Sequence, residues 1–221
     1  MIHDEIFKRI LSSIILFPLI ILAIANGGFF FNFVIILCLI ISLIEWSKIS
    51  FNKIIFYLGF FFLLFSFYSI FKIRNFYFSN DQNIFMFIYV FIICVSTDIG
   101  GFFFGKLFKG PKLTKISPNK TYSGFIGAIF LSAISSYLFL KNSNLFFLTL
   151  YHNDLFFLSI TLLMSIISQL GDIIISYFKR KSKLKDTGNL IPGHGGLLDR
   201  IDGIIFVYPS FYLLLFFINF I

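Results

Sequence analysis

Charged side chains are scarce in this chain of 221 residues. They make up 13% of the sequence, whereas an ordinary soluble domain carries about 25%, and 58% of the residues are hydrophobic. So little charge excludes a soluble globular domain. Short alternating strands, which would indicate an outer-membrane barrel, are also absent. The composition therefore predicts an all-α polytopic membrane protein, because helices satisfy their own backbone hydrogen bonds in lipid.

Cysteine is nearly missing as well. The chain has two, Cys38 and Cys94, and both lie within apolar runs. This placement gives no support to a structural disulfide or a zinc site. We expect both to be small buried hydrophobic residues.

Acidic residues are few, since 10 Asp and Glu stand against 18 Lys and Arg, for a net charge of +8. Such an excess can indicate a nucleic-acid partner. Here, however, the cations lie in short segments between apolar runs, where the positive-inside rule puts them. We therefore expect no nucleic acid, and anionic lipid headgroups and phosphates instead.

Long apolar runs are what the sequence has in abundance. A helix needs about 20 apolar residues to cross a membrane, and seven runs approach this length: 10–25, 29–44, 54–71, 84–104, 122–140, 155–178 and 204–221. The patch 145–151 is too short to cross, and a pair of extra crossings would raise the count to nine. We treat 1–221 as one integral membrane domain, with the spans of 1–80 as a scaffold and 84–221 as the catalytic part.

The positions of the basic residues test this topology. With the N-terminus inside, 15 of the 18 Lys and Arg fall on the cytoplasmic side. This asymmetry agrees with seven spans. It also places two polar loops, 106–121 and 179–202, in the cytoplasm, so we expect the active site to face that way.

Two aspartates, Asp98 and Asp172, fall within predicted spans near their cytoplasmic ends. A carboxylate at that depth is unfavourable unless it is paired, metal-bound or facing water. Asp172 directly follows Gly171, and Asp98 lies two residues before Gly100 and Gly101; glycine allows a ligand or another backbone to approach closely. The alternative is a carboxylate paired with a nearby lysine for packing alone.

Asp199 and Asp202 are three residues apart at the expected start of the last span. On a helix they share one face and could hold one hard cation. Alone, this spacing is more typical of a solvated helix cap. Together with Asp172 across a hairpin, it becomes a candidate magnesium site.

Two loop motifs complete the polar set. His194, Gly195 and Gly196 follow a Pro-Gly pair, which predicts an irregular loop whose amides can face phosphate oxygens, although His194 could also be an ordinary solvated residue. In the other loop, Ser117 and Thr121 are candidate helix-start residues. Lys120 is placed to meet an anion there, or to act only as a topogenic charge.

The residues from Ser176 to Asp202 carry the most specific pattern. It reads Ser176-x-Phe178-Lys179-Arg180, four residues, Lys185-Asp186-x-Gly188, then Ile191-Pro192-x-His194-Gly195-Gly196-Leu197-x-Asp199-Arg200-x-Asp202. This pattern closely resembles the signature of phosphatidate cytidylyltransferases, also called CDP-diacylglycerol synthases. The segments 98–105 and 117–124 resemble further motifs of that family. Ser123 and Ile175 depart from it, because the family commonly has Glu at both places.

The resemblance implies transfer of a cytidylyl group from CTP to phosphatidic acid, giving CDP-diacylglycerol and pyrophosphate. It implies Mg²⁺, with a second cation nearby, on Asp172, Asp199 and Asp202, which together with Lys185 and His194 form the catalytic set. The substrate-binding set is Asp98, Ser117, Lys120, Thr121, Lys179, Arg180, Gly195, Gly196 and Arg200. A homodimer in a bacterial plasma membrane is also implied.

Three other functions compete with this one. The CDP-alcohol phosphotransferases carry a DGxxAR segment that the sequence lacks. An ion transporter using Asp98 and Asp172 would distribute charge through the membrane depth, whereas here the polar residues gather at one face. A CTP-dependent lipid kinase is the nearer rival, because it too would need magnesium and basic residues.

Overall fold

A computed structural model describes residues 18–75, 80–114, 116–142, 154–188, 190 and 195–217. Within these ranges the chain is helical and forms no strand, only one isolated bridge between Lys112 and Thr121. A helical stretch over 18–26 precedes α2 (Gly28–Ile49), α3 (Lys53–Asn75), α4 (Asn80–Phe108), α5 (Tyr122–Asn142), α7 (Asp154–Lys181), α8 (Leu198–Ile201) and α9 (Ile204–Phe217). The all-α prediction is confirmed for the described residues.

Five of these helices are long and apolar enough to cross a membrane, namely α2, α3, α4, α5 and α7. The apolar helix α9 is shorter, at 14 residues. The first half of the first predicted span, 10–25, lies outside the described residues, as does the apolar patch 145–151. The chain is thus a helical membrane protein with at least five candidate spans, and the count of seven is not confirmed.

The helices extend beyond the predicted spans. The span expected to end at Ile44 continues as α2 to Ile49, and α4 is longer than its span by four residues at each end. Hydropathy marks the part of a helix that lies in hydrocarbon, but backbone hydrogen bonding continues into the polar interface. The extension of α2 matters because it brings Glu45 into the helix.

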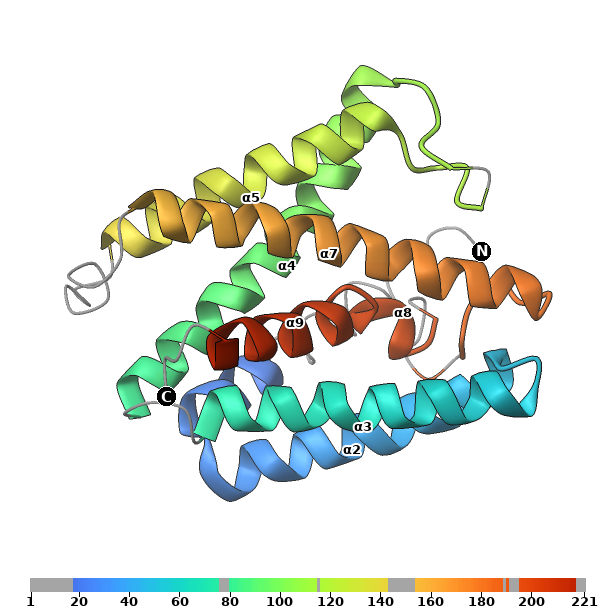
Figure 1. Ribbon diagram of the computed structural model, residues 1–221, viewed down its shortest axis with the longest axis horizontal. Coiled ribbons are helices and arrows are strands. Elements are labelled where there is room, and N and C mark those ends of the chain that lie inside the picture. The colour runs from blue at the N-terminus through green and yellow to red at the C-terminus, as the bar shows by residue number, and fades with distance from the viewer. Residues whose placement is uncertain are drawn as a thin grey trace.

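Figure 1 shows how the helices are arranged. The antiparallel pair α2 and α3 lies along one side, α9 packs between α3 and α7, and α5 lies against the far side of α7. Helix α4 crosses the others obliquely and packs along α5. The loop joining α4 to α5 projects toward the same side as the C-terminal end of α7, so the two polar loops lie at one end of the bundle.

Glycines allow α4 and α5 to approach closely. A Cβ atom on Gly124 would lie 2.6 Å from the carbonyl oxygen of Gly101, and one on Gly100 would lie 2.7 Å from that of Gly127. Backbone atoms cannot move aside as a flexible side chain can. Close packing of this kind is the usual way in which small residues join helices in lipid.

Replacement of Gly124 with alanine should therefore push α4 and α5 apart and destabilise the protein by about 1–3 kcal/mol. Gly101→Ala on the facing helix is the matched control, because its Cβ would lie 3.8 Å from Ala128, an ordinary contact. Thermal unfolding of both variants in one detergent compares them. Equal melting temperatures would contradict the packing argument.

Buried hydroxyls join α7 to α4 inside the bundle. Thr161 lies 2.7 Å from the Tyr89 hydroxyl, and Thr97 donates to Ser165 at 2.9 Å. Thr161, Ser165 and Asp172 follow one another on the same face of α7, since their spacing is four and seven residues. These contacts fix α4 against α7 and so set the positions of the aspartates that each helix carries. Cys38 and Cys94 are both free; Cys94 is buried, as predicted, whereas Cys38 is only half-buried.

Candidate active site

A cavity of about 440 Å³ opens where α4, α7, the loop before α5 and the segment around α8 meet. Its lining includes most of the side chains predicted to carry chemistry: Asp98, Ser117, Lys120, Thr121, Asp172, Lys179, Asp199, Arg200 and Asp202. These residues are spread over more than 100 positions of the chain. The fold therefore brings the two predicted polar loops together around one space.

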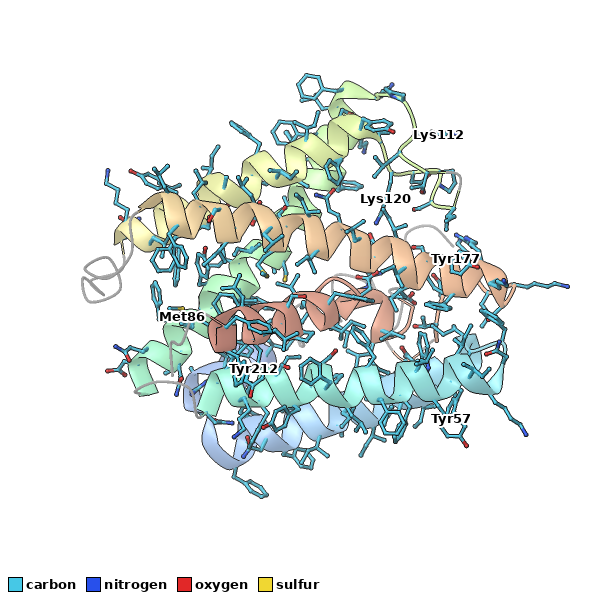
Figure 2. All side chains as sticks on the ribbon, in the orientation of Figure 1. Tyr57, Met86, Lys112, Lys120, Tyr177 and Tyr212 are labelled. Atoms are coloured by element: carbon cyan, nitrogen blue, oxygen red, sulfur yellow. The ribbon has the colours of Figure 1, made fainter. Side chains whose placement is uncertain are left out.

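Asp172 and Lys120 form an ion pair across this cavity. The Lys120 Nζ atom lies 2.6 Å from Asp172 Oδ2 and 3.4 Å from the carbonyl oxygen of Gln169. Figure 2 shows Lys120 extending from the loop toward α7. Lys120 thus ties the loop to α7, which a purely topogenic lysine would not do.

Asp199 lies in a dense hydrogen-bond network. Its Oδ1 atom accepts from Lys179 Nζ at 2.6 Å, while Oδ2 accepts the backbone N–H groups of Thr187, at 2.8 Å, and Gly196, at 3.1 Å. Burial alone would raise the pKa of Asp199, but the hydrogen bonds from Lys179 and the two amides outweigh it, so the pKa is lowered. Asp199 is therefore a firmly ionised carboxylate that holds Lys179 at the cavity wall.

Asp202 has the opposite environment. It follows α8 directly and is only 9% exposed, and its Oδ1 atom accepts the N–H of Gly203 at 3.0 Å. Burial raises its pKa well above the usual range, and the nearby charges of Asp172 and Asp98 raise it further. Three carboxylates thus lie within electrostatic range of one another, which is unfavourable unless cations such as Lys120 and Lys179 offset their charge.

The carboxylates at this place fit a hard divalent cation. Mg²⁺ commonly takes one or two protein carboxylates and completes its coordination with water and substrate phosphates. Asp172 and Asp202 could supply them, and Asp98 lies within electrostatic range of both. In the described part of the chain, no three His, Cys, Asp or Glu side chains come together as a ready-made metal cluster. The predicted roles of Asp172, Asp199 and Asp202 as ligands all stay predictions. Both oxygens of Asp199 already accept hydrogen bonds, and those of Asp172 are engaged by Lys120 and by the Ser176 hydroxyl, at 3.3 Å.

The helix-start prediction is half confirmed. Helix α5 begins at Tyr122, and the Thr121 hydroxyl accepts the N–H of Gly124 at 3.1 Å, as an N-cap does. Ser117 lies four residues before that cap, so its prediction as a helix-start residue is wrong. Its side chain lies on the cavity wall instead.

Several predicted site residues do not line the cavity. Arg180 and Lys185 are exposed, and the Arg180 guanidinium donates to the carbonyl oxygen of Leu184 at 3.4 Å. Gly195 has a φ of +85°, which favours glycine, and Gly196 acts through its amide on Asp199. His194 lies outside the described residues.

The two departures from the family pattern have local explanations. The Ser123 hydroxyl accepts the N–H of Gly110 at 3.3 Å and so stabilises the loop before α5. Ile175 is 2% exposed and packs in an apolar region with Trp46 and Phe178. An ionised carboxylate at position 175 would have no place in this packing.

Sequence reasoning assigned no role to three polar residues at or near the site. Asp186 and Gln169 line the cavity. Glu45 lies behind it, is only 3% exposed, and accepts hydrogen bonds from the backbone around α8. A signal for Glu45 was present, because it is the one acidic residue between positions 6 and 80.

These features define a class: a helical membrane protein with a cavity of carboxylates and lysines at one end of its bundle, suited to a cation and an anionic substrate. The sequence model of the Cytidylyltransferase family matches residues 50–218, and the chain belongs to that family.

Individual relatives agree with this assignment. A phosphatidate cytidylyltransferase of Rickettsia felis is 35% identical over 225 residues, which cover 98% of this chain and 93% of that protein. The protein of the same name from Rickettsia bellii is 37% identical over 223 residues, with 98% and 91% covered. A phosphatidate cytidylyltransferase of Staphylococcus aureus (strain COL) is 41% identical over 141 residues, 63% of this chain. The chain spans about half of the Staphylococcus protein, since the match covers 52% of it.

Proposed function

We propose that this protein is a phosphatidate cytidylyltransferase that converts CTP and phosphatidic acid to CDP-diacylglycerol and pyrophosphate. The observation that carries the proposal is the cavity itself, which combines Asp172 and Asp202 with Lys120, Lys179 and Arg200. A reaction between two phosphate-bearing substrates needs cations to bring them together and a site for a metal ion. The family membership and the names of the relatives support the same reaction.

The proposed reaction depends on alignment of the two substrates more than on proton transfer. A phosphate oxygen of phosphatidic acid attacks the α-phosphorus of CTP, the bond from that phosphorus to the bridging oxygen breaks, and pyrophosphate leaves. The attacking phosphate is already ionised near neutral pH, so no strong general base is required. The work of the protein is to hold two anions in line and to offset the charge that grows on the departing pyrophosphate.

Each part of the cavity has a role in this proposal. Lys179, oriented by Asp199, and Arg200 would bind phosphates of CTP, while Lys120 would do so from the loop side. Asp172 and Asp202 would hold Mg²⁺, with Asp98 close by for a second cation. When bound, Mg²⁺ would neutralise phosphate charge and polarise the reacting phosphorus. Arg180, in the last turn of α7, and Lys185 are exposed outside the cavity. The catalytic roles of Lys185 and His194 and the substrate-binding role of Arg180 are kept as part of the proposal.

The sidedness and assembly are part of the proposal. The cavity lies at the end of the bundle where the polar loops carry most of the basic residues, so we assign that end to the cytoplasm, where CTP is present. Seven spans in a bacterial plasma membrane and a homodimer complete the proposed arrangement. Cysteine labelling of a Lys112→Cys variant in intact and opened cells tests the sidedness, and cross-linking in native membranes tests the dimer.

One assay separates the proposed function from its rivals. Purified protein in detergent is given Mg²⁺, phosphatidic acid and CTP labelled either at the α- or at the γ-phosphate. We expect lipid-bound label only from the α-position, with pyrophosphate released in equal amount. Label from the γ-position would indicate a lipid kinase. Failure to label the lipid in either case, across several detergents, would reject the transferase.

A further inference from the structure

Glu45 is a buried carboxylate that forms no ion pair with a Lys or Arg among the described residues. Its oxygens accept hydrogen bonds from the segment around α8 instead. Its Oε1 atom accepts the N–H of Leu197 at 2.9 Å, and its Oε2 atom accepts the N–H of Leu198 at 2.7 Å. Oε2 also lies 2.8 Å from the hydroxyl of Thr187. Glu45 itself is not on the cavity wall. It therefore reaches the site only through the segment that it holds.

Thr187 joins Glu45 to the site. Its hydroxyl lies 2.8 Å from Glu45 Oε2 and 3.0 Å from Asp199 Oδ2. A hydroxyl carries one proton and can donate to one acceptor at a time. The shorter distance favours donation to Glu45, while the Thr187 N–H serves Asp199. Glu45 thus fixes Thr187, Thr187 orients Asp199, and Asp199 holds Lys179 at the cavity wall.

The position of the Glu45 carboxylate also explains why residues 188 and 196 are glycines. A Cβ atom on Gly196 would lie 2.1 Å from the Thr187 hydroxyl oxygen and 2.6 Å from Glu45 Oε2. One on Gly188 would lie 2.8 Å from Glu45 Oε1. The space that two side chains would need is filled by Glu45 and Thr187, which is independent support for a built contact.

We propose that Glu45 is a positioning residue of the active site, which anchors the backbone at 197–198 and, through Thr187, sets the orientation of Asp199 and Lys179. It lies outside the residues 50–218 that match the family, on a helix that we had assigned to the scaffold. The effect on turnover rests on the proposed function, whereas the anchoring of the segment does not. Two measurements are therefore needed.

The first variant is Glu45→Gln, which keeps the size of the side chain but turns an amide N–H₂ toward a backbone donor. We expect kcat/KM for CTP to fall about tenfold or more, the size of effect seen when a residue that orients a metal ligand is lost, and KM to increase. A mere loss of folded protein would lower the apparent kcat and leave KM unchanged. Hydrogen exchange at the Leu197 and Leu198 amides should become faster while α3 and α4 stay protected. Asp81→Asn, at the exposed start of α4, is the control and should alter neither result.

Thr187 supplies a second pair of variants if Glu45→Gln does not fold. Thr187→Val removes the hydroxyl and should raise KM for CTP. Thr187→Ser keeps a hydroxyl at this position, and its KM should lie close to that of the unaltered protein. Unchanged KM and unchanged exchange in Glu45→Gln, or equal behaviour of the Thr187 variants, would overturn the inference. If the unaltered protein transfers no cytidylyl group, the proposed function fails, and the exchange rates of Leu197 and Leu198 alone then decide the role of Glu45.

Discussion

Replacement of Asp202 with asparagine is expected to lower the rate of the proposed cytidylyl transfer by at least about 100-fold. Asp202 is a proposed metal ligand, and removing a residue that only orients such a ligand already costs about 10- to 100-fold. The same change should leave the protein as stable as before or more stable. Asp202 is buried beside Asp172 and Asp98, and its raised pKa means that folding disfavours its ionised form. Asparagine removes that charge while keeping the shape of the side chain.

The measurement is initial rate against Mg²⁺ concentration, together with the melting temperature in detergent. If Asp202 serves the reaction at a cost in stability, Asp202→Asn should lower activity while it leaves the melting temperature unchanged or raises it. Asp81→Asn, an exposed carboxylate at the start of α4, serves as the matched control. Normal turnover in Asp202→Asn would remove Asp202 from the proposed metal site.

Replacement of Asp199 with asparagine should lower turnover about as much as Asp202→Asn does, but unlike that change it should also lower the stability of the protein. Asp199 accepts hydrogen bonds from Lys179 and from two backbone amides, and an asparagine cannot accept them all. It would also leave the Lys179 ammonium without its counter-charge. We expect a loss of about 1–3 kcal/mol, as for a buried donor that loses its acceptor.

The double variant Asp199→Asn with Lys179→Met separates the two contributions. If the ion pair matters to stability, the two changes together should destabilise less than the sum of each alone. The lowered pKa of Asp199 also gives a pH dependence. Its contribution to stability is complete above the ordinary aspartate pKa of about 3.9 and is lost as the pH falls through the depressed value. Additive effects on the melting temperature would contradict a direct Lys179 to Asp199 pair.

The sequence predicts the helical membrane fold and most of the charged side chains on the cavity wall. Long apolar runs and scarce charge are enough for the helices, since lipid leaves the backbone few alternatives. The spacing of the 176–202 pattern identifies Lys179, Asp199 and Asp202. What it does not predict is their pairing: Asp199 looked like a metal ligand equal to Asp202, yet it contacts a lysine and two amides, while Asp202 faces other carboxylates.

The contacts of Glu45 show why part of the site could not be predicted from the sequence. Its partners, the amides of Leu197 and Leu198, lie 152 and 153 residues further along the chain. Every residue except proline has such an amide, so no residue type marks the contact. Hydropathy also ended the second span at Ile44, one residue too early to bring Glu45 into view. Only the folded arrangement relates the end of α2 to α8.

The distance along the chain between Glu45 and α8 has a consequence for biogenesis. Membrane insertion proceeds from the N-terminus during synthesis, so α2 enters the bilayer long before Leu197 and Leu198 have been made. Through most of translation Glu45 has none of its amide partners, and Lys179 has no Asp199. The cavity cannot be complete in a nascent chain until α7 and α8 have been made and have folded back on α2. We therefore expect synthesis interrupted before that point to yield a fragment that lacks the proposed active site.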